Sequence, residues 1–210
     1  MIHNIVFDLG GVIIKIDKSQ AIQRFIEVGF DQAERYLDDF EQQGFFGQLE
    51  SGAITAEQFR RQLSALAGKP MTMDDCLRGW QGYFVELPQR NLDKVMELRS
   101  RGYRVSLLSN TNPFMMQWAR SSDFDPAGHG IEHYFDALYL SYELRVMKPD
   151  RRIFELMLAG EHASSAEAIF VDDSRRNVDA AAALGIHTLL TSNGGDWHAP
   201  LEQLLAQHLQ

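Results

Sequence analysis

The sequence predicts an α/β protein in which a parallel β-sheet carries helices on both faces and a helical segment follows the first strand. Short apolar and β-branched runs indicate strands, and helical patterns of crossover length separate most of them. The interval from about Asp17 to Pro88 differs, because it shows helical periodicity and no convincing strand. The predicted strands are Ile5–Phe7, Arg104–Leu108, Ala137–Leu140, Ala168–Val171 and Thr188–Thr191.

The first strand lies in "HNIVFDLGGVIIKID" and ends in a charged residue and two glycines. Burying an unpaired carboxylate costs several kcal/mol, so we expect Asp8 to lie at the strand end and to face a cation or hydrogen-bond donors. Gly10 and Gly11 allow positive φ and let backbone N–H groups approach a ligand closely. Taken alone, the stretch fits a ligand site no better than a simpler structure, in which a strand is followed by a glycine turn and the aspartate only caps the turn.

Helical signals fill the connections. "LDKVMELRSRG" has apolar residues at helical spacing and stops at Gly102, and the alanine-rich "NVDAAAALG" stops at Gly185. In the interval after the first strand, the pairs Thr55–Gln58 and Thr72–Asp75 resemble N-terminal caps. This interval of roughly 70 residues has the size of a small subdomain. We expect a discontinuous core domain of residues 1–16 and 88–210 and a helical cap of residues 17–87.

Polar residues follow the predicted strands at their carboxyl ends. In open parallel sheets ligands bind beyond these ends, so the side chains should meet at one edge of the sheet. Pro149 biases the residue before it away from helix, which places a lysine in the loop after the third strand. These residues are Asp8, Ser109, Asn110, Thr111, Asn112, Lys148, Asp172 and Asp173.

Composition excludes several classes of protein. The net charge of −9 argues against nucleic acid or an anionic membrane as a partner. The single cysteine, Cys76, excludes an intramolecular disulfide, and we expect it to be a small buried apolar residue. The sequence shows neither an apolar run near the roughly 18 residues of a membrane span nor a signal-peptide pattern. We therefore expect a cytoplasmic protein, a monomer or a weak dimer.

Four segments resemble, in order and spacing, the motifs of the haloacid dehalogenase superfamily. They are "FDLGGVI", "LLSNTN", "MKPDRRIF" and "FVDDSRRNVDAA". The helical interval stands where that superfamily has its helical cap, and the similarity spans nearly the whole chain. It is strongest to small bacterial phosphatases with "DLGNV" or "DLGGV" in the first motif, α-glucose-1-phosphatases among them. The resemblance implies a Rossmann-like core and an Mg²⁺-dependent phosphatase acting on a small phosphorylated metabolite.

The resemblance also implies roles for individual residues. Asp8 would be the nucleophile that forms an aspartyl phosphate, and Lys148 would hold phosphate and offset the acids as a point charge. Asp8, the Gly10 carbonyl and Asp173 would hold Mg²⁺, which prefers oxygen ligands. The predicted phosphate-binding residues are Gly11, Ser109, Asn110 and Lys148. Of the supporting residues, Asp172 would cap the following helix or act in the site, and Asn177 would orient Asp173 or a metal-bound water.

Gly10 departs from the superfamily pattern. Most of its phosphatases carry there a second aspartate that protonates the leaving group, and such an acid contributes about 10²–10⁴-fold in rate. An anomeric oxygen leaves more readily than an ordinary alkoxide, so a sugar 1-phosphate such as glucose 1-phosphate is the leading substrate prediction. The missing acid argues against a phosphomutase. The alternatives are a weakly active phosphate-binding or regulatory protein and, as the least favoured, a 2-haloacid dehalogenase.

Two further stretches carry predictions. "HGIEH", from His129 to His133, matches an inverted zinc-protease motif, but a surface loop explains it better because Gly130 is a poor helix residue. Residues of the cap that could line the pocket are Phe45, Phe46, Gln48, Glu50 and Trp80, the last through a stacking face. The simpler explanation for the aromatic ones is packing in the core of the cap.

Overall fold

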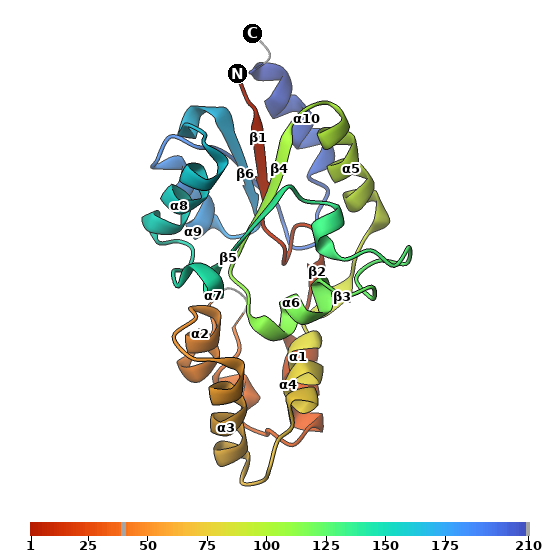
Figure 1. The fold of residues 1–210 in the computed structure, drawn as a ribbon, viewed down its shortest axis with the longest axis vertical. Coiled ribbons are helices and arrows are strands. Elements are labelled where there is room, and N and C mark those ends of the chain that lie inside the picture. Colours follow the sequence, from red (N-terminus) through yellow and green to blue (C-terminus); the bar gives the residue numbers. More distant parts are fainter. Residues whose placement is uncertain (39–40, 209–210) are drawn as a thin grey trace.

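A five-stranded parallel sheet with strand order β5-β4-β1-β6-β7 forms the centre of the protein (Figure 1). The computed structural model describes residues 1–38 and 41–208. All five predicted strands form, with each end within one residue of its predicted position. They are β1 (Asn4–Phe7), β4 (Arg104–Ser109), β5 (Ala137–Leu140), β6 (Ala168–Asp172) and β7 (His187–Leu190).

Helices cover both faces of the sheet (Figure 1). Successive strand residues point to opposite faces, so β1 serves two apolar cores. Ile5 and Phe7 pack with residues of α5 and α10, whereas Val6 packs with residues of α8 and α9. Burial on both faces explains why the central strands read as continuous apolar runs. The four helices are α5 (Gln89–Ser100), α8 (Arg151–Glu161), α9 (Arg175–Ala182) and α10 (His198–Gln207).

Shorter helices occupy the loops. Asn112 caps α6 (Pro113–Ala119) by accepting hydrogen bonds from the N–H groups of Phe114 and Met115, and α7 follows β5 directly. The chain after β4 thus continues as a helix that packs against the helices following the first strand, with the ring centroids of Phe114 and Phe59 5.8 Å apart. The remaining short elements are α7 (Ser141–Leu144) and the 3₁₀ turns η1 (Ala33–Arg35), η2 (Ile131–His133) and η3 (Ser165–Glu167).

Four helices lie together beyond the carboxyl ends of the strands (Figure 1). Both predicted caps form complete capping boxes, Thr55 with Gln58 and Thr72 with Asp75. Aromatic rings fill the space between the helices, as in the pair Phe46 and Trp80 with ring centroids 5.3 Å apart. The helices are α1 (Lys18–Glu27), α2 (Gly44–Glu50), α3 (Ala56–Ala67) and α4 (Met73–Gln81).

The prediction that residues 17–88 contain no strand is wrong. β3 (Phe84–Glu86) pairs antiparallel with β2 (Lys15–Ile16), and the backbone N–H of Asp17 donates to the carbonyl of Tyr83 at 2.9 Å. Strands of two and three residues are too short for an alternating pattern to register in the sequence. The pair joins the two ends of the helical interval, which fixes where the chain leaves the core and where it returns.

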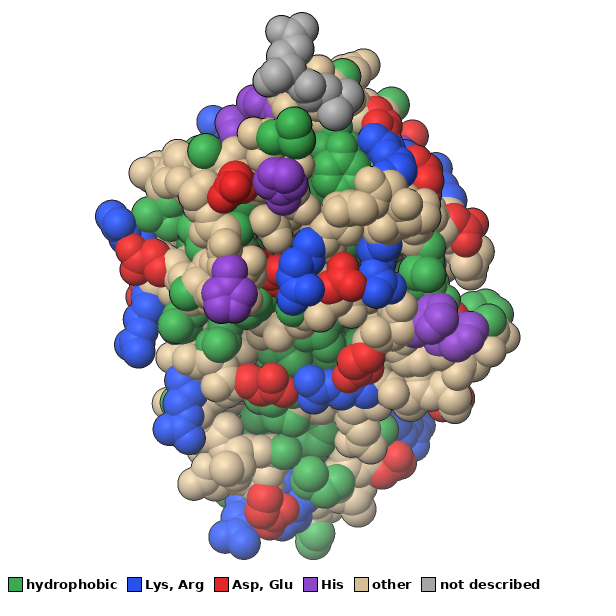
Figure 2. All heavy atoms as spheres, turned by 45° about the horizontal axis from the view of Figure 1, so that its top comes forward, with side chains coloured by type: hydrophobic (Ala, Val, Ile, Leu, Met, Phe, Trp, Pro, Cys, Tyr) green, Lys and Arg blue, Asp and Glu red, His purple; other side chains and the backbone are tan. Residues whose placement is uncertain are grey.

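The surface carries charges of both signs. On the face in Figure 2, lysine and arginine side chains are interspersed with aspartate and glutamate, and no broad basic patch appears there. This mixture of signs accompanies a net charge of −9. Within residues 1–38 and 41–208, every helix is too short or too polar to span a bilayer.

Candidate active site

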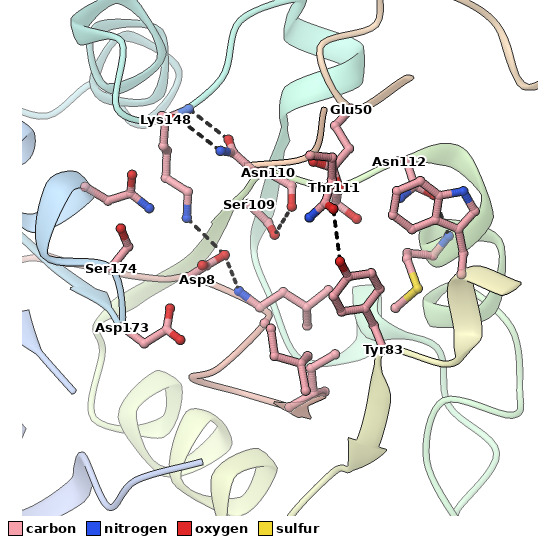
Figure 3. Close-up of a pocket in the computed structure, with 18 residues that line it drawn as sticks. Asp8, Glu50, Tyr83, Ser109, Asn110, Thr111, Asn112, Lys148, Asp173 and Ser174 are labelled. Atoms are coloured by element: carbon pink, nitrogen blue, oxygen red, sulfur yellow. Dashed lines mark hydrogen bonds and ion pairs between the residues drawn. The ribbon is translucent and has the colours of Figure 1, made fainter. Parts of the chain in front are cut away.

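The carboxyl ends of β1, β4 and β6 open onto one pocket (Figure 3), and helices α1–α4, called the cap helices below, lie beyond the same strand ends (Figure 1). This is the edge at which ligands of open parallel sheets bind. The structure brings together there the residues predicted from the strand ends, except that Asp172 lies beneath the pocket wall. The predicted residues on the wall are Asp8, Gly10, Ser109, Asn110, Lys148, Asp173 and Asn177.

Lys148 is the buried centre of the charge network. Its Nζ lies 3.0 Å from Asp8 Oδ1 and 2.7 Å from Asp172 Oδ2, and it donates to the Leu108 carbonyl at 2.9 Å. Burial by itself lowers the pKa of this amine, but the two carboxylates outweigh burial and hold the pKa above its ordinary value. Lys148 is therefore a permanent positive charge against the predicted nucleophile.

Asp172 is fully buried and holds the network from below. Its carboxylate accepts hydrogen bonds from the Ser174 N–H at 2.7 Å and from Asn177 Nδ2, which lies 3.1 Å from each oxygen. The prediction that Asn177 orients Asp173 is therefore wrong, and the alternative, that it orients a metal-bound water, stays a prediction. Residue 177 lies in the first turn of α9, and its side-chain amide binds the carboxylate at the end of β6 while the residue also lines the pocket. Asp172 and Asn177 position Lys148 together.

Asp8 and Asp173 are the acids left for a cation. Burial, followed by repulsion from neighbouring carboxylates, raises the pKa of Asp173 to about 7. Burial likewise raises the pKa of Asp8 to about 6, although Lys148 opposes the rise. Oxygens of Asp8, Asp172 and Asp173 lie within 4.8 Å of one another, and Gly10 lines the pocket beside them. Both oxygens of Asp172 already accept hydrogen bonds, and the residue is fully buried beneath the pocket wall, so the oxygen donors that fit Mg²⁺ are Asp8, the Gly10 carbonyl and Asp173.

Gly11 makes room for Asp173 and is not placed to bind phosphate. Its N–H donates to the Ile14 carbonyl at 2.8 Å, so the prediction of a free N–H group at this position is wrong. Its φ is +80°, and a Cβ there would lie 2.0 Å from Asp173 Oδ2. The Gly11 N–H is thus bonded within the tight turn after β1, and the position requires glycine because a side chain would collide with Asp173.

Ser109 and Asn110 differ in what they offer a phosphate. The Ser109 Oγ is 3.4 Å from the Asn110 carbonyl, a long contact that leaves the hydroxyl group available on the pocket wall (Figure 3). The Asn110 side-chain amide is engaged by the backbone of Lys148, because its Nδ2 donates to the Lys148 carbonyl at 2.9 Å and its Oδ1 accepts from the Lys148 N–H at 2.8 Å. The predicted contact through the Asn110 backbone stays a prediction, and the side chain fixes the lysine loop.

The cap side of the pocket differs from the prediction. Glu50 and Trp80 line it, but Phe45 and Phe46 are buried in the aromatic core of the cap and Gln48 is exposed. The simpler explanation for the phenylalanines is confirmed. Trp80 is only 1% exposed and offers no stacking face, although its Nε1 has no hydrogen-bond partner among the described residues.

Two lining residues of the cap side carried no signal in the sequence. The Tyr83 hydroxyl donates to Gln42 Oε1 at 3.0 Å, and both residues line the pocket. Neither lies in a recognisable motif, and only the docking of the cap over the sheet edge brings them to the site. On the core side, the pocket is also lined by Thr111 and Asn112, which the sequence had placed at the end of the second predicted strand.

The structure gives no support to a zinc site or a reactive thiol. His129 and His133 are exposed and stacked with ring centroids 4.0 Å apart, and Glu132 pairs with Arg120. In the described part of the chain, the three acids at the strand ends are the one cluster suited to a metal. Cys76 is buried, and burial raises the pKa of its thiol to about 12, as expected for a packing residue.

Comparison with known proteins identifies the family. A model of haloacid dehalogenase-like hydrolases matches residues 2–185. D-ribitol-5-phosphate phosphatase from Bacteroides thetaiotaomicron is 44% identical over 205 residues, 98% of this chain and 99% of that protein.

Solved structures agree with this result. A predicted HAD-like hydrolase from Porphyromonas gingivalis has a TM-score of 0.92 and 38% identity, over 98% of each chain. A HAD family enzyme from B. thetaiotaomicron, solved with magnesium and inorganic phosphate, has a TM-score of 0.86 and 34% identity, over 95% of this chain and 99% of that one. These matches confirm the predicted α/β fold class. The chain belongs to the haloacid dehalogenase-like hydrolases.

Proposed function

We propose that this protein is an Mg²⁺-dependent phosphatase that hydrolyses the monophosphate of a sugar or a sugar alcohol through an aspartyl phosphate on Asp8. The observation that carries the proposal is the buried Lys148, 3.0 Å from Asp8 and opposite Asp173 in an otherwise acidic pocket. The relative named D-ribitol-5-phosphate phosphatase and the enzyme solved with magnesium and phosphate support this chemistry.

Each residue has a defined task in this reaction. Bound Mg²⁺, held by Asp8, the Gly10 carbonyl and Asp173, would neutralise charge on the phosphate. Lys148 keeps Asp8 ionised and oriented for in-line attack, and the Ser109 hydroxyl is placed to donate to a phosphate oxygen. Asp8 Oδ then displaces the alcohol from phosphorus, and water later releases phosphate from Asp8.

The substrate is proposed as a class. Glucose 1-phosphate follows from the leaving-group argument at Gly10, whereas the relative's name points to a sugar-alcohol 5-phosphate, whose leaving group is an ordinary alkoxide. At the pocket wall, Trp80 Nε1 and Asn112 Nδ2 have no hydrogen-bond partner of good geometry among the described residues, which suits hydroxyl-bearing molecules of either kind. A cytoplasmic location and a monomeric or weakly dimeric state belong to the same proposal.

The test is phosphate release from a panel of D-ribitol 5-phosphate, glucose 1-phosphate and glucose 6-phosphate, with Mg²⁺ or with EDTA. The Asp8→Asn variant is the control for the nucleophile. We expect release that needs Mg²⁺ and is abolished by Asp8→Asn. Binding of Mg²⁺ and phosphate without turnover would favour the regulatory alternative, and halide release from a 2-haloacid would favour the dehalogenase.

A further inference from the structure

Glu50 is a buried carboxyl group on the cap side of the pocket. It is the last residue of α2, its exposed fraction is 6%, and it lines the pocket together with Asp8. No ion pair joins it to any residue in ranges 1–38 and 41–208. A buried acid without a cation is costly, so its position calls for a reason.

The backbone around Glu50 is clamped to the core. The Ser141 hydroxyl, fully buried at the start of α7, donates to the Glu50 carbonyl at 2.6 Å. Two residues later, Gly52 comes so close to the core that a Cβ would lie 2.2 Å from the Tyr142 carbonyl oxygen. The carboxyl group is therefore held at the contact between cap and core, not on a loose side of the cap.

The charges around Glu50 favour its neutral form. Burial raises the pKa of Glu50 to about 8, the Asn112 amide opposes the rise, and the negative charge of Asp8 adds to it. Lys148 lines the same pocket but is engaged by Asp8 and Asp172. From the remaining elements, the ionisable groups on the pocket wall are those of Asp173 and Tyr83. At neutral pH, Glu50 carries a proton that it can give away.

Glu50 also lies on the side where a leaving group must lie. In Figure 3, Asp173 and Ser174 lie on one side of Asp8, and Glu50 and Asn112 lie on the other. In-line attack by Asp8 sends the leaving oxygen away from the nucleophile, toward the cap. The Asn112 Nδ2 is buried there without a hydrogen-bond partner of good geometry among the described residues.

We propose that Glu50 is the acid that protonates the leaving oxygen, in place of the carboxyl group that Gly10 lacks. This inference rests on the proposed phosphatase activity and deepens it. In the first step, Asp8 bonds to phosphorus, the bond from phosphorus to the leaving oxygen breaks, and the Glu50 proton passes to that oxygen to give the alcohol. In the second step, water bonds to phosphorus, its proton returns to the Glu50 carboxylate, and Asp8 leaves as phosphate is released.

The test compares leaving groups. D-ribitol 5-phosphate has an alkoxide leaving group that needs a proton, whereas p-nitrophenyl phosphate releases a phenolate that needs none. For Glu50→Gln we expect kcat/KM to fall about 10²–10⁴-fold on the first ester and far less on the second. The alkaline limb of the wild-type pH profile, set by Glu50, should disappear in the variant. Glu57→Gln is the matched control, because Glu57 lies on the exposed side of α3 and pairs with Arg60 and Arg61.

The outcomes separate the two proposals. A wild type that hydrolyses neither ester refutes the phosphatase itself and this inference with it. A wild type active on both esters, with Glu50→Gln losing equally on each or on neither, overturns the role of Glu50 alone. Circular dichroism and Mg²⁺ titration of the variant show whether the fold and the metal site persist, and we expect both to be unchanged.

Discussion

Replacing Glu50 with glutamine should stabilise the protein against unfolding, by an amount that grows with pH. Burial raises the pKa of Glu50 from an ordinary 4.5 to about 8, so the folded protein binds a proton there that the unfolded chain releases above pH 4.5. The folded pKa is the higher one. The contribution of Glu50 to stability is therefore fully present below pH 4.5 and is lost as pH rises toward 8. Glutamine is neutral in both the folded and the unfolded protein, so its contribution to stability does not change with pH.

The size of the effect follows from the shift. At about 1.4 kcal/mol per pKa unit, the advantage of Glu50→Gln is under about 1 kcal/mol at pH 5, about 3 kcal/mol at pH 7 and roughly 4–5 kcal/mol at pH 9. Urea unfolding of both proteins at these pH values, without metal, measures it as a difference in the free energy of unfolding.

A matched substitution isolates the cause. Arg60 and Arg61 lower the pKa of Glu57 to about 2, so Glu57 is ionised in both states throughout this range. The effect of Glu57→Gln should be constant from pH 6 to pH 9. An effect of Glu50→Gln that is equally flat, or that turns destabilising as pH rises, would refute the conclusion that Glu50 is protonated at neutral pH.

Three other perturbations test the rest of the site. Gly10→Asp should fold, because a Cβ at this position would meet nothing nearer than a side-chain carbon at 3.4 Å, and aggregation of the variant would contradict this. In the Glu50→Gln background, we expect Gly10→Asp to restore the rate on an alkyl phosphate by about 10-fold or more. Lys148→Met leaves Asp8 and Asp172 close together without a cation, so the free energy of unfolding in urea at pH 7 should fall by about 3–5 kcal/mol. An unchanged urea midpoint would show that Lys148 does not stabilise the two carboxylates. Mg²⁺ affinity, measured by calorimetry, should weaken as pH falls from 8 to 5.5, because protons compete at Asp8 (pKa about 6) and Asp173 (pKa about 7); tighter binding in acid would exclude these carboxylates as ligands.

Local signals in the sequence predicted most of the fold. Apolar β-branched runs located all five central strands, and the pairs Thr55–Gln58 and Thr72–Asp75 marked two helix starts where capping boxes form. Such features depend on residues a few positions apart, so they can be predicted from the sequence. The short β2–β3 pair was missed because each strand offers too few residues for a pattern.

The predicted gathering of strand-end residues also followed from the sequence. Parallel strands place their carboxyl ends at one edge, so Asp8, Ser109 and Asp173 had to lie near one another. The sequence did not determine which partner each residue has there. Asn177 binds Asp172 rather than Asp173, and the Gly11 N–H donates to the Ile14 carbonyl within the turn.

Part of the cap side of the pocket was decided by tertiary structure alone. Gln42 and Tyr83 come from separate segments and meet only because the cap helices lie against the sheet edge. The sequence indicated Glu50 as a residue that could line the pocket, but not its protonation state. Its protonated state results from burial and from the nearby charge of Asp8, neither of which is a property of neighbouring residues in the chain. Spacing along a sequence identifies which groups are available, but desolvation and charge at a distance, which set their chemistry, exist only in the folded protein.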